Sequence, residues 1–258
     1  MASHHLTTQE HARRKVAVVT GAAGTLGESI TGMLLSEGYV VAALDIRAEG
    51  LSALKATLDK KSDQYHAFAV DISSAPAVEE VCRTILTRLG AVSVLINNAG
   101  LLSNHKCLQT SLTEWHRVMH VNVDGAFLLS QQLLPCMRSM HFGRIVNITS
   151  MAAKTGGVTA GTAYAVSKGA LASLTFSLAR ETAGDGITVN GVAPAYVKTP
   201  MVMQQLREEQ RVQVLNNIPV GRFCEPEEVA HTVRFLISPL AGFITGEIID
   251  QNGGYHMD

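Results

Sequence analysis

The sequence predicts a single α/β domain built on a doubly wound, mostly parallel sheet with helices on both faces. Three observations indicate this fold. Short β-branched runs alternate with longer segments of helical period along the 258-residue chain. A glycine-rich turn follows the first of these runs. No proline-rich linker, block of charge or internal repeat marks a second domain.

The β-branched runs define the expected strands, and the segments between them define the expected helices. We expect strands at residues 15–20, 39–45, 66–72, 92–98, 144–150, 187–194 and 244–250. We expect helices near residues 25–37, 48–60, 76–89, 112–140, 161–184 and 225–238. The runs at 15–20, 92–98 and 144–150 are nearly all apolar, which is typical of parallel strands covered on both faces.

Two segments lie outside this alternation. Residues 1–12 are polar and are expected to form a flexible N-terminal arm, which leaves 13–258 as the domain. Residues 199–217 form a polar helical insertion that we expect to be a substrate lid, with a permanently packed surface helix as the alternative. Its apolar side chains make only a thin stripe, so little of it can be buried (Leu206, Val212 and Leu215).

The charge balance argues against several classes of partner. The chain has 21 Lys and Arg against 22 Asp and Glu, and it has no basic run that could follow a phosphate backbone. We therefore expect no nucleic-acid partner. No apolar run reaches the roughly 18 residues of a membrane span, and the start, MASHHLTTQEHARRK, lacks the apolar core of a secretory signal. These features predict a cytoplasmic protein with no membrane partner.

The cysteines and histidines do not form a metal-binding pattern. The four cysteines lie far apart with no C-x-x-C pair, so we interpret them as buried thiols of a reducing compartment (Cys82, Cys107, Cys136 and Cys224). Four histidines have no carboxylate or cysteine partner at ligand spacing (His105, His116, His120 and His141). The sequence therefore predicts no metal site.

The turn after the first strand has the features of a phosphate-binding loop. Gly21, Gly24 and Gly27 let the backbone approach a pyrophosphate, and the N–H groups at a helix start favour an anion. Their G-x-x-G-x-x-G spacing is by itself a weak signal, since a plain structural turn is the alternative. Asp45 strengthens it, because a carboxylate at the end of the second strand can accept both ribose hydroxyls of NAD. Together they predict a Rossmann-like site for NAD.

Polar residues also follow the third and fourth expected strands. Asp71 closes one, and the turn Asn97–Gly100 closes the other. The carboxyl ends of parallel strands meet at one edge of the sheet, where open α/β sheets bind their ligands. These residues are therefore expected beside the dinucleotide.

The most specific residue pattern is Ser150, at the end of the fifth strand, followed by Tyr164 and Lys168. A spacing of four places Tyr164 and Lys168 on one helical face, so that an ammonium can lie near the phenol. A phenol has a pKa near ~10, and a nearby cation lowers it towards neutral pH, where it can exchange protons with a substrate. Y-x-x-x-K alone occurs by chance in many proteins, and the upstream serine makes the pattern specific.

In combination these motifs resemble those of the short-chain dehydrogenase/reductase family, in the branch with a Y-x-x-x-K site. The resemblance covers roughly residues 13–256. It rests on these segments, in order: TGAAGTLG at 20–27, LD at 44–45, VDI at 70–72, NNAG at 97–100, VNVDG at 121–125, VNITS at 146–150, YAVSK at 164–168, VNGVAPAYVKT at 189–199 and TGEIIDQNGGY at 245–255.

The resemblance implies roles for the matching residues. Ser150 would hydrogen-bond the substrate oxygen, and Tyr164 would be the general acid/base. Lys168 would bind the nicotinamide ribose and lower the pKa of Tyr164, and Asn122 would hold a proton-relay water. The implied cofactor-binding residues are Gly21, Gly24, Thr25, Leu26, Gly27, Asp45, Asp71, Ile72, Asn98, Ala99, Gly100, Tyr164, Lys168, Pro194, Val197 and Thr199.

Within that set, the resemblance places Asp71 and Ile72 beside the adenine and Asn98 and Gly100 along the ribose path. Val197 and Thr199 would hold the carboxamide.

Two positions depart from the family pattern. Thr25 stands where this branch usually has a glycine, which affects the detailed phosphate contacts. Ala195 stands where the family mostly has a glycine after Pro194, and its Cβ narrows the nicotinamide pocket slightly. Neither position belongs to the expected catalytic set.

The resemblance implies an NAD(P)-dependent oxidoreductase that transfers a hydride between the cofactor and a ketone or secondary alcohol. Asp45 favours NAD, because its carboxylate would repel the 2′-phosphate of NADP; use of both cofactors stays open as the alternative, since Arg47 can pair with that phosphate. Residues 177–199 and 245–255 are most similar to 3-oxoacyl-acyl-carrier-protein reductases, in which Arg138 and Arg180 would face an acidic carrier. Sugar-alcohol, diol and hydroxysteroid dehydrogenases share the framework and stay open as alternatives. A non-catalytic dinucleotide-binding regulator is the alternative from another class, and the presence of Tyr164 and Lys168 argues against it.

The sequence also predicts an oligomer. Residues 118–137 and 163–179 are small or apolar around nearly the whole helix, whereas a surface helix keeps a polar face. We expect each to be covered once by the sheet and once by a second subunit, in a homotetramer as in the resembled family.

Overall fold

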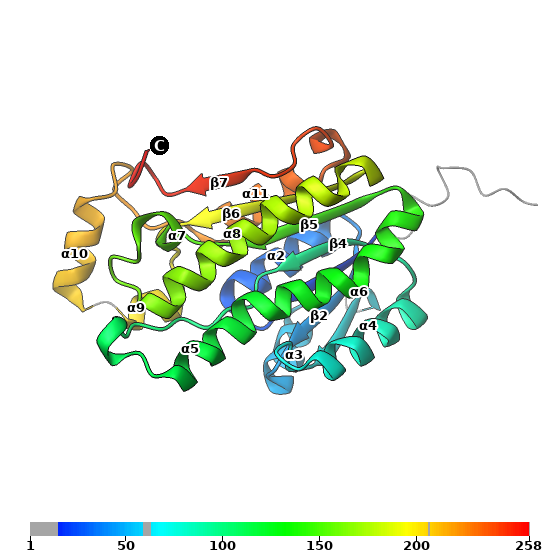
Figure 1. The fold of residues 1–258 in the computed structure, drawn as a ribbon, viewed down its shortest axis with the longest axis horizontal. Helices are drawn as coiled ribbons and strands as arrows, with labels where there is room; N and C mark the ends of the chain where they lie inside the picture. Colours follow the sequence, from blue (N-terminus) through cyan, green and yellow to red (C-terminus); the bar gives the residue numbers. More distant parts are fainter. Residues whose placement is uncertain (1–14, 59–62, 206, 258) are drawn as a thin grey trace, which may run out of the picture.

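The computed structural model describes residues 15–58, 63–205 and 207–257, and within them it shows a seven-stranded sheet with helices on both faces (Figure 1). The strand order is β3-β2-β1-β4-β5-β6-β7, and each neighbouring pair is parallel. The strands are β1 (Val16–Thr20), β2 (Val40–Asp45), β3 (Tyr65–Ala69), β4 (Val92–Asn97), β5 (Gly143–Ile148), β6 (Ile187–Pro194) and β7 (Ile248–Gln251). This confirms the predicted doubly wound parallel sheet. The expected arm at 1–12 lies outside the described residues.

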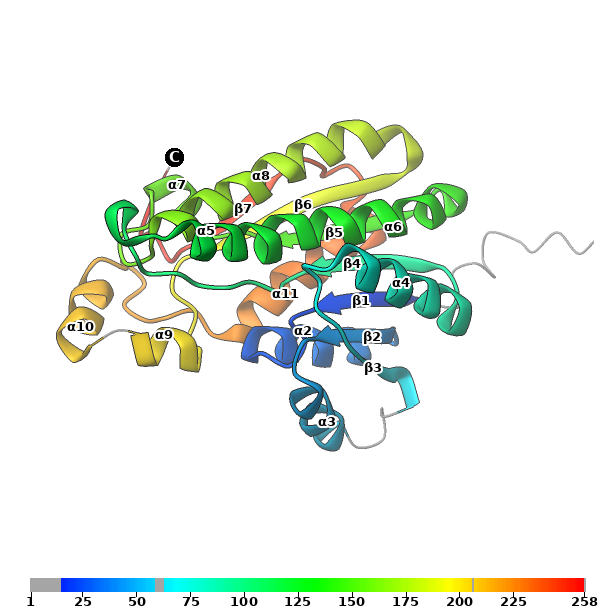
Figure 2. The same ribbon diagram turned by 60° about the horizontal axis from the view of Figure 1, so that its bottom comes forward.

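The helices cover the sheet in two layers (Figures 1 and 2). The apolar sides of α2 (Thr25–Ser36), α3 (Ala48–Thr57) and α11 (Pro226–Ile237) pack into one hydrophobic cluster. Those of α4 (Ala75–Leu89), α6 (Gly125–Met140) and α8 (Thr162–Thr182) pack into a second cluster on the opposite face. No helix among the described residues is both long and apolar enough to cross a membrane.

The central strands are buried on both sides, as their apolar runs predict. In β1, Ala17 and Val19 join one cluster, while Val16 and Val18 join the other. Successive side chains of a strand point to opposite faces, so a strand between two helical layers needs apolar residues at every position. Every residue of β4 and β5 is likewise buried. The sheet therefore gives a rigid base for the polar turns at its carboxyl edge.

The observed elements differ from the expected ones at several places. The helix expected at 112–140 is α5 (Leu112–Met119) and α6, joined by a π-helical turn, η3 (His120–Asp124). The last strand begins at Ile248 rather than 244, because a turn with Gly246 at a φ of 76° precedes it. Three short elements of the described chain were not expected from the sequence: the 3-10 helices η2 (Cys107–Gln109) and η5 (Pro239–Ala241) and the helix α7 (Ala152–Thr155).

The insertion after β6 contains two short helices, α9 (Pro200–Gln205) and α10 (Glu208–Asn216). The expected apolar stripe is wrong at Val212, which is 50% exposed, because Val214 is the buried residue of α10. Val214 packs with Ile218 and Phe223 in a small cluster separate from the two main ones. Leu206 lies outside the described residues.

Candidate active site

A cleft of about 920 Å³ opens along the carboxyl edge of the sheet. Its wall is made by the turns that follow β1 to β6, together with residues of α2, α5, η3, α8 and α9. Every residue that the sequence assigned to the cofactor lies on that wall: Gly21, Gly24, Thr25, Leu26, Gly27, Asp45, Asp71, Ile72, Asn98, Ala99, Gly100, Tyr164, Lys168, Pro194, Val197 and Thr199. Ser150 lines the cleft too, whereas Asn122 is buried behind the wall.

The glycine-rich turn is shaped by two close approaches. Gly21 has a φ of 62°, and a Cβ there would lie 2.9 Å from the Cα of Ala99. A Cβ on Gly27 would lie 2.1 Å from the carbonyl oxygen of Gly21, so these two positions require glycine. Gly24 is different, since its nearest neighbour would be 3.5 Å away. Gly24 is the N-cap of α2 and supplies no capping side chain, which leaves the helix start open to an anion in the cleft.

Asp45 joins the second strand to this turn. One carboxylate oxygen accepts the backbone N–H of Ala23 at 3.0 Å, and the other accepts the backbone N–H of Arg47 at 3.0 Å. The Arg47 guanidinium also donates to that second oxygen at 3.3 Å and to the carbonyl oxygen of Ala23 at 2.7 Å. Asp45 is 8% exposed and lines the cleft, so its carboxylate is fixed in place with acceptor capacity left for a ligand hydroxyl.

The end of β4 is fastened to the same turn. The side-chain amide of Asn98 donates to the carbonyl oxygens of Thr20 and Gly21, at 2.9 and 3.2 Å. In return, the hydroxyl of Thr20 accepts the backbone N–H groups of Asn98 and Ala99, at 3.0 and 2.9 Å. Asn98 therefore acts on the structure of the phosphate-binding turn, in addition to lining the cleft.

Ser150, Tyr164 and Lys168 meet where β5 ends and α8 begins. The ammonium of Lys168 donates to the carbonyl oxygen of Ile148 at 2.7 Å and lies 5.7 Å from the centre of the Tyr164 ring. The Ser150 hydroxyl, which accepts the backbone N–H of Ala152 at 3.1 Å, lies beside the phenol of Tyr164 and lines the cleft with it. The expected helical spacing is confirmed, because Tyr164 and Lys168 lie on α8 and both line the cleft.

The electrostatics of this trio differ from the sequence expectation. Burial raises the pKa of Tyr164, and the neighbouring Ser150 hydroxyl lowers that pKa by a smaller amount. Burial also lowers the pKa of Lys168 to about 8. The sequence predicts that Lys168 lowers the pKa of Tyr164, but the largest effect on that pKa is desolvation, which raises it.

Asn122 lies in the π-helical turn between α5 and α6 and is 1% exposed. Its side-chain oxygen accepts the backbone N–H of Leu101 at 2.7 Å, and its amide donates to the carbonyl oxygen of Leu101 at 3.0 Å. The same amide donates to the hydroxyl of Ser167 at 2.9 Å. Asn122 therefore braces the chain after β4 against α8, directly behind the wall that carries Gly100 and Lys168.

Several cleft residues were not anticipated from the sequence. One face of α5 and η3 lines the outer part of the cleft, with Thr113, His116, Arg117, His120 and Val121. Their spacing of three and four residues is the signal that would have grouped them. The histidines of this face belong to no cluster of three or more potential metal ligands within the described residues.

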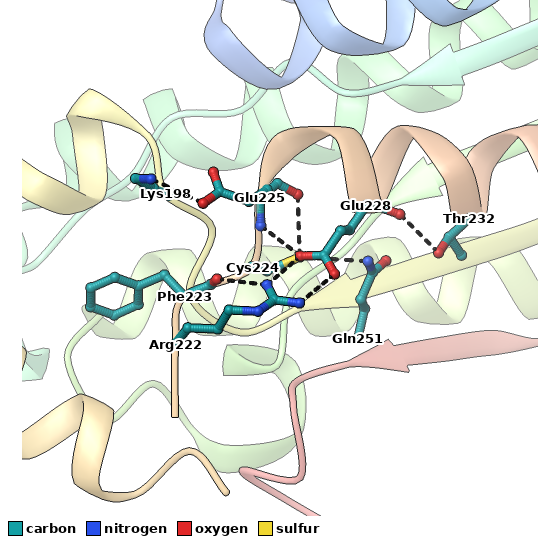
Figure 3. Close-up of polar contacts among 8 residues, drawn as sticks. All are labelled: Lys198, Arg222, Phe223, Cys224, Glu225, Glu228, Thr232 and Gln251. Carbon is teal, nitrogen blue, oxygen red and sulfur yellow. Dashed lines mark hydrogen bonds and ion pairs between the residues drawn. The ribbon is translucent and has the colours of Figure 1, made fainter. Parts of the chain in front are cut away.

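A second unanticipated group supports the chain after β6 (Figure 3). The segment that carries Val197 pairs in parallel with Cys224, through backbone hydrogen bonds of 2.9 and 2.8 Å. Glu228, on the first turn of α11, accepts a hydrogen bond from each terminal nitrogen of the Arg222 guanidinium, at 2.6 and 2.8 Å. Only the fold brings residues 196–198 beside residues 222–228, so no local pattern indicated this group.

Of the two arginines expected to face a carrier protein, Arg138 and Arg180, the first has partners within the chain. Arg138 donates to Asp185 at 2.8 Å and to Glu181 at 2.9 Å. Its positive charge is therefore balanced locally, and it does not stand alone as an acceptor for an acidic partner.

Comparisons with known proteins agree with this geometry. Residues 21–256 match the family model described as enoyl-(acyl carrier protein) reductase. The chain is 34% identical to a 3-oxoacyl-(acyl-carrier-protein) reductase of Thermotoga maritima, over 93% of this chain and 97% of that protein. It is 36% identical to the enzyme of that name from Vibrio cholerae, over 94% and 98%. A crystal structure from Brucella melitensis described as a short-chain dehydrogenase/reductase, glucose/ribitol dehydrogenase, superposes with a TM-score of 0.88 at 32% identity, covering 95% of this chain and 97% of that one.

Proposed function

Because the chain belongs to the short-chain dehydrogenase/reductase family, we propose from its cleft a reductase of 3-oxoacyl thioesters that uses NAD(H). The coarser function follows from the family itself: it is an NAD(P)-dependent oxidoreductase that interconverts a ketone and a secondary alcohol. The thioester is favoured by the curated relatives of similar length, which are 3-oxoacyl-(acyl-carrier-protein) reductases. The single structural observation that carries the proposal is the meeting of Ser150, Tyr164 and Lys168 on one wall of the cleft.

The cleft fits a dinucleotide along its length. The open N-terminus of α2 suits a pyrophosphate, and the fixed carboxylate of Asp45 suits a ribose diol. A phosphate on the 2′-oxygen would instead meet that carboxylate, a like-charge contact that costs several kcal/mol. This contrast supports the preference for NAD(H) over NADP(H).

When bound, a reduced nicotinamide supplies the hydride. We assign to Ser150 and Tyr164 the hydrogen bonds that hold and polarise the substrate carbonyl. The phenol of Tyr164 then gives its proton to the oxygen as the carbon is reduced, and takes it back in the oxidative direction. Lys168 holds a positive charge 5.7 Å from the Tyr164 ring, which favours the tyrosinate formed during the reduction.

The remaining roles are assigned by position. We propose that Asn122 fixes the chain after β4, and through it the inner wall of the cleft, and that it orders the proton-relay water there. We propose that Asp71 and Ile72 flank the adenine and that Val197 and Thr199 contact the carboxamide, since all four line the cleft. Helices α9 and α10 would cover the substrate as a lid.

A cytoplasmic location is part of the proposal. It is supported by the four cysteines, all of which are free thiols. The expected burial is confirmed for Cys82 and is wrong for Cys107, which is exposed, while Cys136 and Cys224 are partly buried.

A panel of substrates tests the proposal. Oxidation of NADH and of NADPH should be followed with 3-oxoacyl thioesters of coenzyme A and of acyl carrier protein, and with keto-sugar, diketone and 3-ketosteroid compounds. We expect the highest kcat/KM for a 3-oxoacyl thioester with NADH. Since Arg138 is paired with Asp185 and Glu181, we expect the carrier to add little over coenzyme A. A higher kcat/KM for a sugar or steroid ketone would overturn the thioester proposal.

A further inference from the structure

The segment after β6 depends on a neighbour far away in the sequence. Val197 and Thr199 line the cleft, but between β6 and α9 the segment has no helix or long strand to hold it. Its main regular contact is the parallel bridge between Val197 and Cys224. In that bridge the N–H of Cys224 donates to the carbonyl of Tyr196 at 2.9 Å, and the N–H of Lys198 donates to the carbonyl of Cys224 at 2.8 Å.

Cys224 is held in turn by its sequence neighbours on both sides. The Arg222 guanidinium donates to the carbonyl oxygen of Phe223 at 3.1 Å and to both carboxylate oxygens of Glu228. The backbone N–H of Glu225 donates to Glu228 at 2.9 Å. One carboxylate therefore fastens the residues before and after Cys224 to the first turn of α11 (Figure 3).

The Glu228 carboxylate and the Arg222 guanidinium form a two-bond ion pair, which is a strong geometry for such a contact. Two parallel N–H···O bonds from one guanidinium to one carboxylate fix both distance and orientation, whereas a single surface ion pair contributes little. Arg222 and Cys224 add favourable contacts, and together with the N–H of Glu225 they lower the pKa of Glu228 to about 2. The thiol of Cys224 stays protonated at neutral pH, because burial raises its pKa to about 11.

We infer that Glu228 is a positioning residue for the nicotinamide end of the cofactor, acting through Arg222 and the Cys224 bridge on Val197 and Thr199. The inference rests on the proposed function, which places the carboxamide beside those two residues. The adenine end lies at β2 and β3, on the far side of β1, β4 and β5 in the sheet. Loss of the contact between Glu228 and Arg222 should therefore weaken binding of the nicotinamide end and leave binding of the adenine end unchanged.

The test compares NADH with ADP-ribose, which has the adenine, both phosphates and the ribose units but no nicotinamide. Glu228→Gln keeps the size of the side chain and an acceptor for the N–H of Glu225, and it removes the paired charge. Glu37→Gln is the matched control, since Glu37 pairs with Arg234 of the same helix at 2.8 Å with a similar exposure, away from the cleft. Arg222→Lys keeps the charge and removes the two-bond geometry.

We expect Glu228→Gln to weaken NADH binding about tenfold, which corresponds to the loss of one charge-assisted hydrogen bond. ADP-ribose binding should stay within about twofold of the wild type. Arg222→Lys should have an intermediate effect, and Glu37→Gln none. Hydrogen exchange of residues 196–199 should be faster in unliganded Glu228→Gln than in the wild type. Equal affinities of wild type and variant for NADH would overturn the inference.

Equal losses of NADH and ADP-ribose binding with a lowered melting temperature would also overturn it, in favour of a structural role. A wild type that binds ADP-ribose and gains nothing from the nicotinamide would refute the proposed function first, so the two failures are distinguishable.

Discussion

The ammonium nitrogen of Lys168 lies 5.7 Å from the centre of the Tyr164 ring. Burial lowers the pKa of Lys168 to about 8 and raises the pKa of Tyr164. At neutral pH the site therefore holds a charged ammonium beside a neutral phenol. This is the protonation state in which a phenol can donate a proton to a carbonyl oxygen.

The buried ammonium of Lys168 should lower the free energy of unfolding at neutral pH. A lysine whose folded pKa is about 8 and whose unfolded pKa is 10.5 opposes folding while it is protonated, fully below about pH 8 and no longer above about pH 10.5. We expect Lys168→Met to raise the free energy of unfolding of the unliganded protein at pH 7, on the order of 1–2 kcal/mol after the lost hydrogen bond to Ile148.

Urea titrations at pH 7 and pH 9.5 measure this effect. The advantage of Lys168→Met should shrink at the higher pH, while turnover is lost at both. A variant less stable than the wild type at pH 7 would show that the hydrogen bond of Lys168, rather than its desolvation, dominates.

Asp45 should decide between the two nicotinamide cofactors. Asp45→Asn keeps an acceptor for the N–H of Ala23 and removes the negative charge. We expect kcat/KM to fall with NADH and to rise with NADPH, changing their ratio about tenfold or more. Arg47 is the nearest cation and would then be free to meet a 2′-phosphate. A wild-type enzyme that already prefers NADPH would refute the assignment of Asp45.

Helices α9 and α10 should exchange amide hydrogens faster than the core strands. Val214 is the only fully buried residue in the described part of α10, so this helix is held by few apolar contacts. We expect protection at 200–205 and 208–216 to be weak in the free protein and to increase with NADH and a substrate analogue, while β4 and β5 change little. Protection equal to that of β4 in both states would rule out a mobile lid.

The outer faces of α6 and α8 should lie in a subunit interface. Phe127, Val166 and Phe176 are 45%, 43% and 51% exposed there, although large apolar side chains favour burial. We expect light scattering to give a homotetramer, and Phe127→Glu with Phe176→Glu to give a smaller species. A monomeric wild type at micromolar concentration would contradict this.

The sequence allowed the sheet to be predicted because its signals are local. The apolar run of β4 and the glycines after β1 are determined by burial on two faces and by close backbone approach, and both are visible in single segments. The π-helical turn at Asn122 was not predictable in that way, because the amide reaches Leu101 and Ser167, 21 and 45 residues away. The same holds for the contact of Glu228 with the segment around Val197.

The candidate site shows the same division. The spacing of Tyr164 and Lys168 predicted their common helical face, which the structure confirms. Their pKa values depend on how deeply the fold buries the two side chains, and the spacing of the residues does not reveal this burial. The raised pKa of Tyr164 therefore follows from its burial in the structure and was not predictable from the sequence.

The proton transfer assigned to Tyr164 is tested most directly by a single-turnover measurement on Tyr164→Phe. The variant keeps the ring and removes the hydroxyl that meets Ser150. NADH binding, followed by its fluorescence, should stay within about twofold of the wild type, because the phenol proton is used only in the chemical step. Mixing the preformed complex with a 3-oxoacyl thioester should then oxidise NADH about 10²–10⁴-fold more slowly than in the wild type. Wild-type rates in this variant would contradict the account.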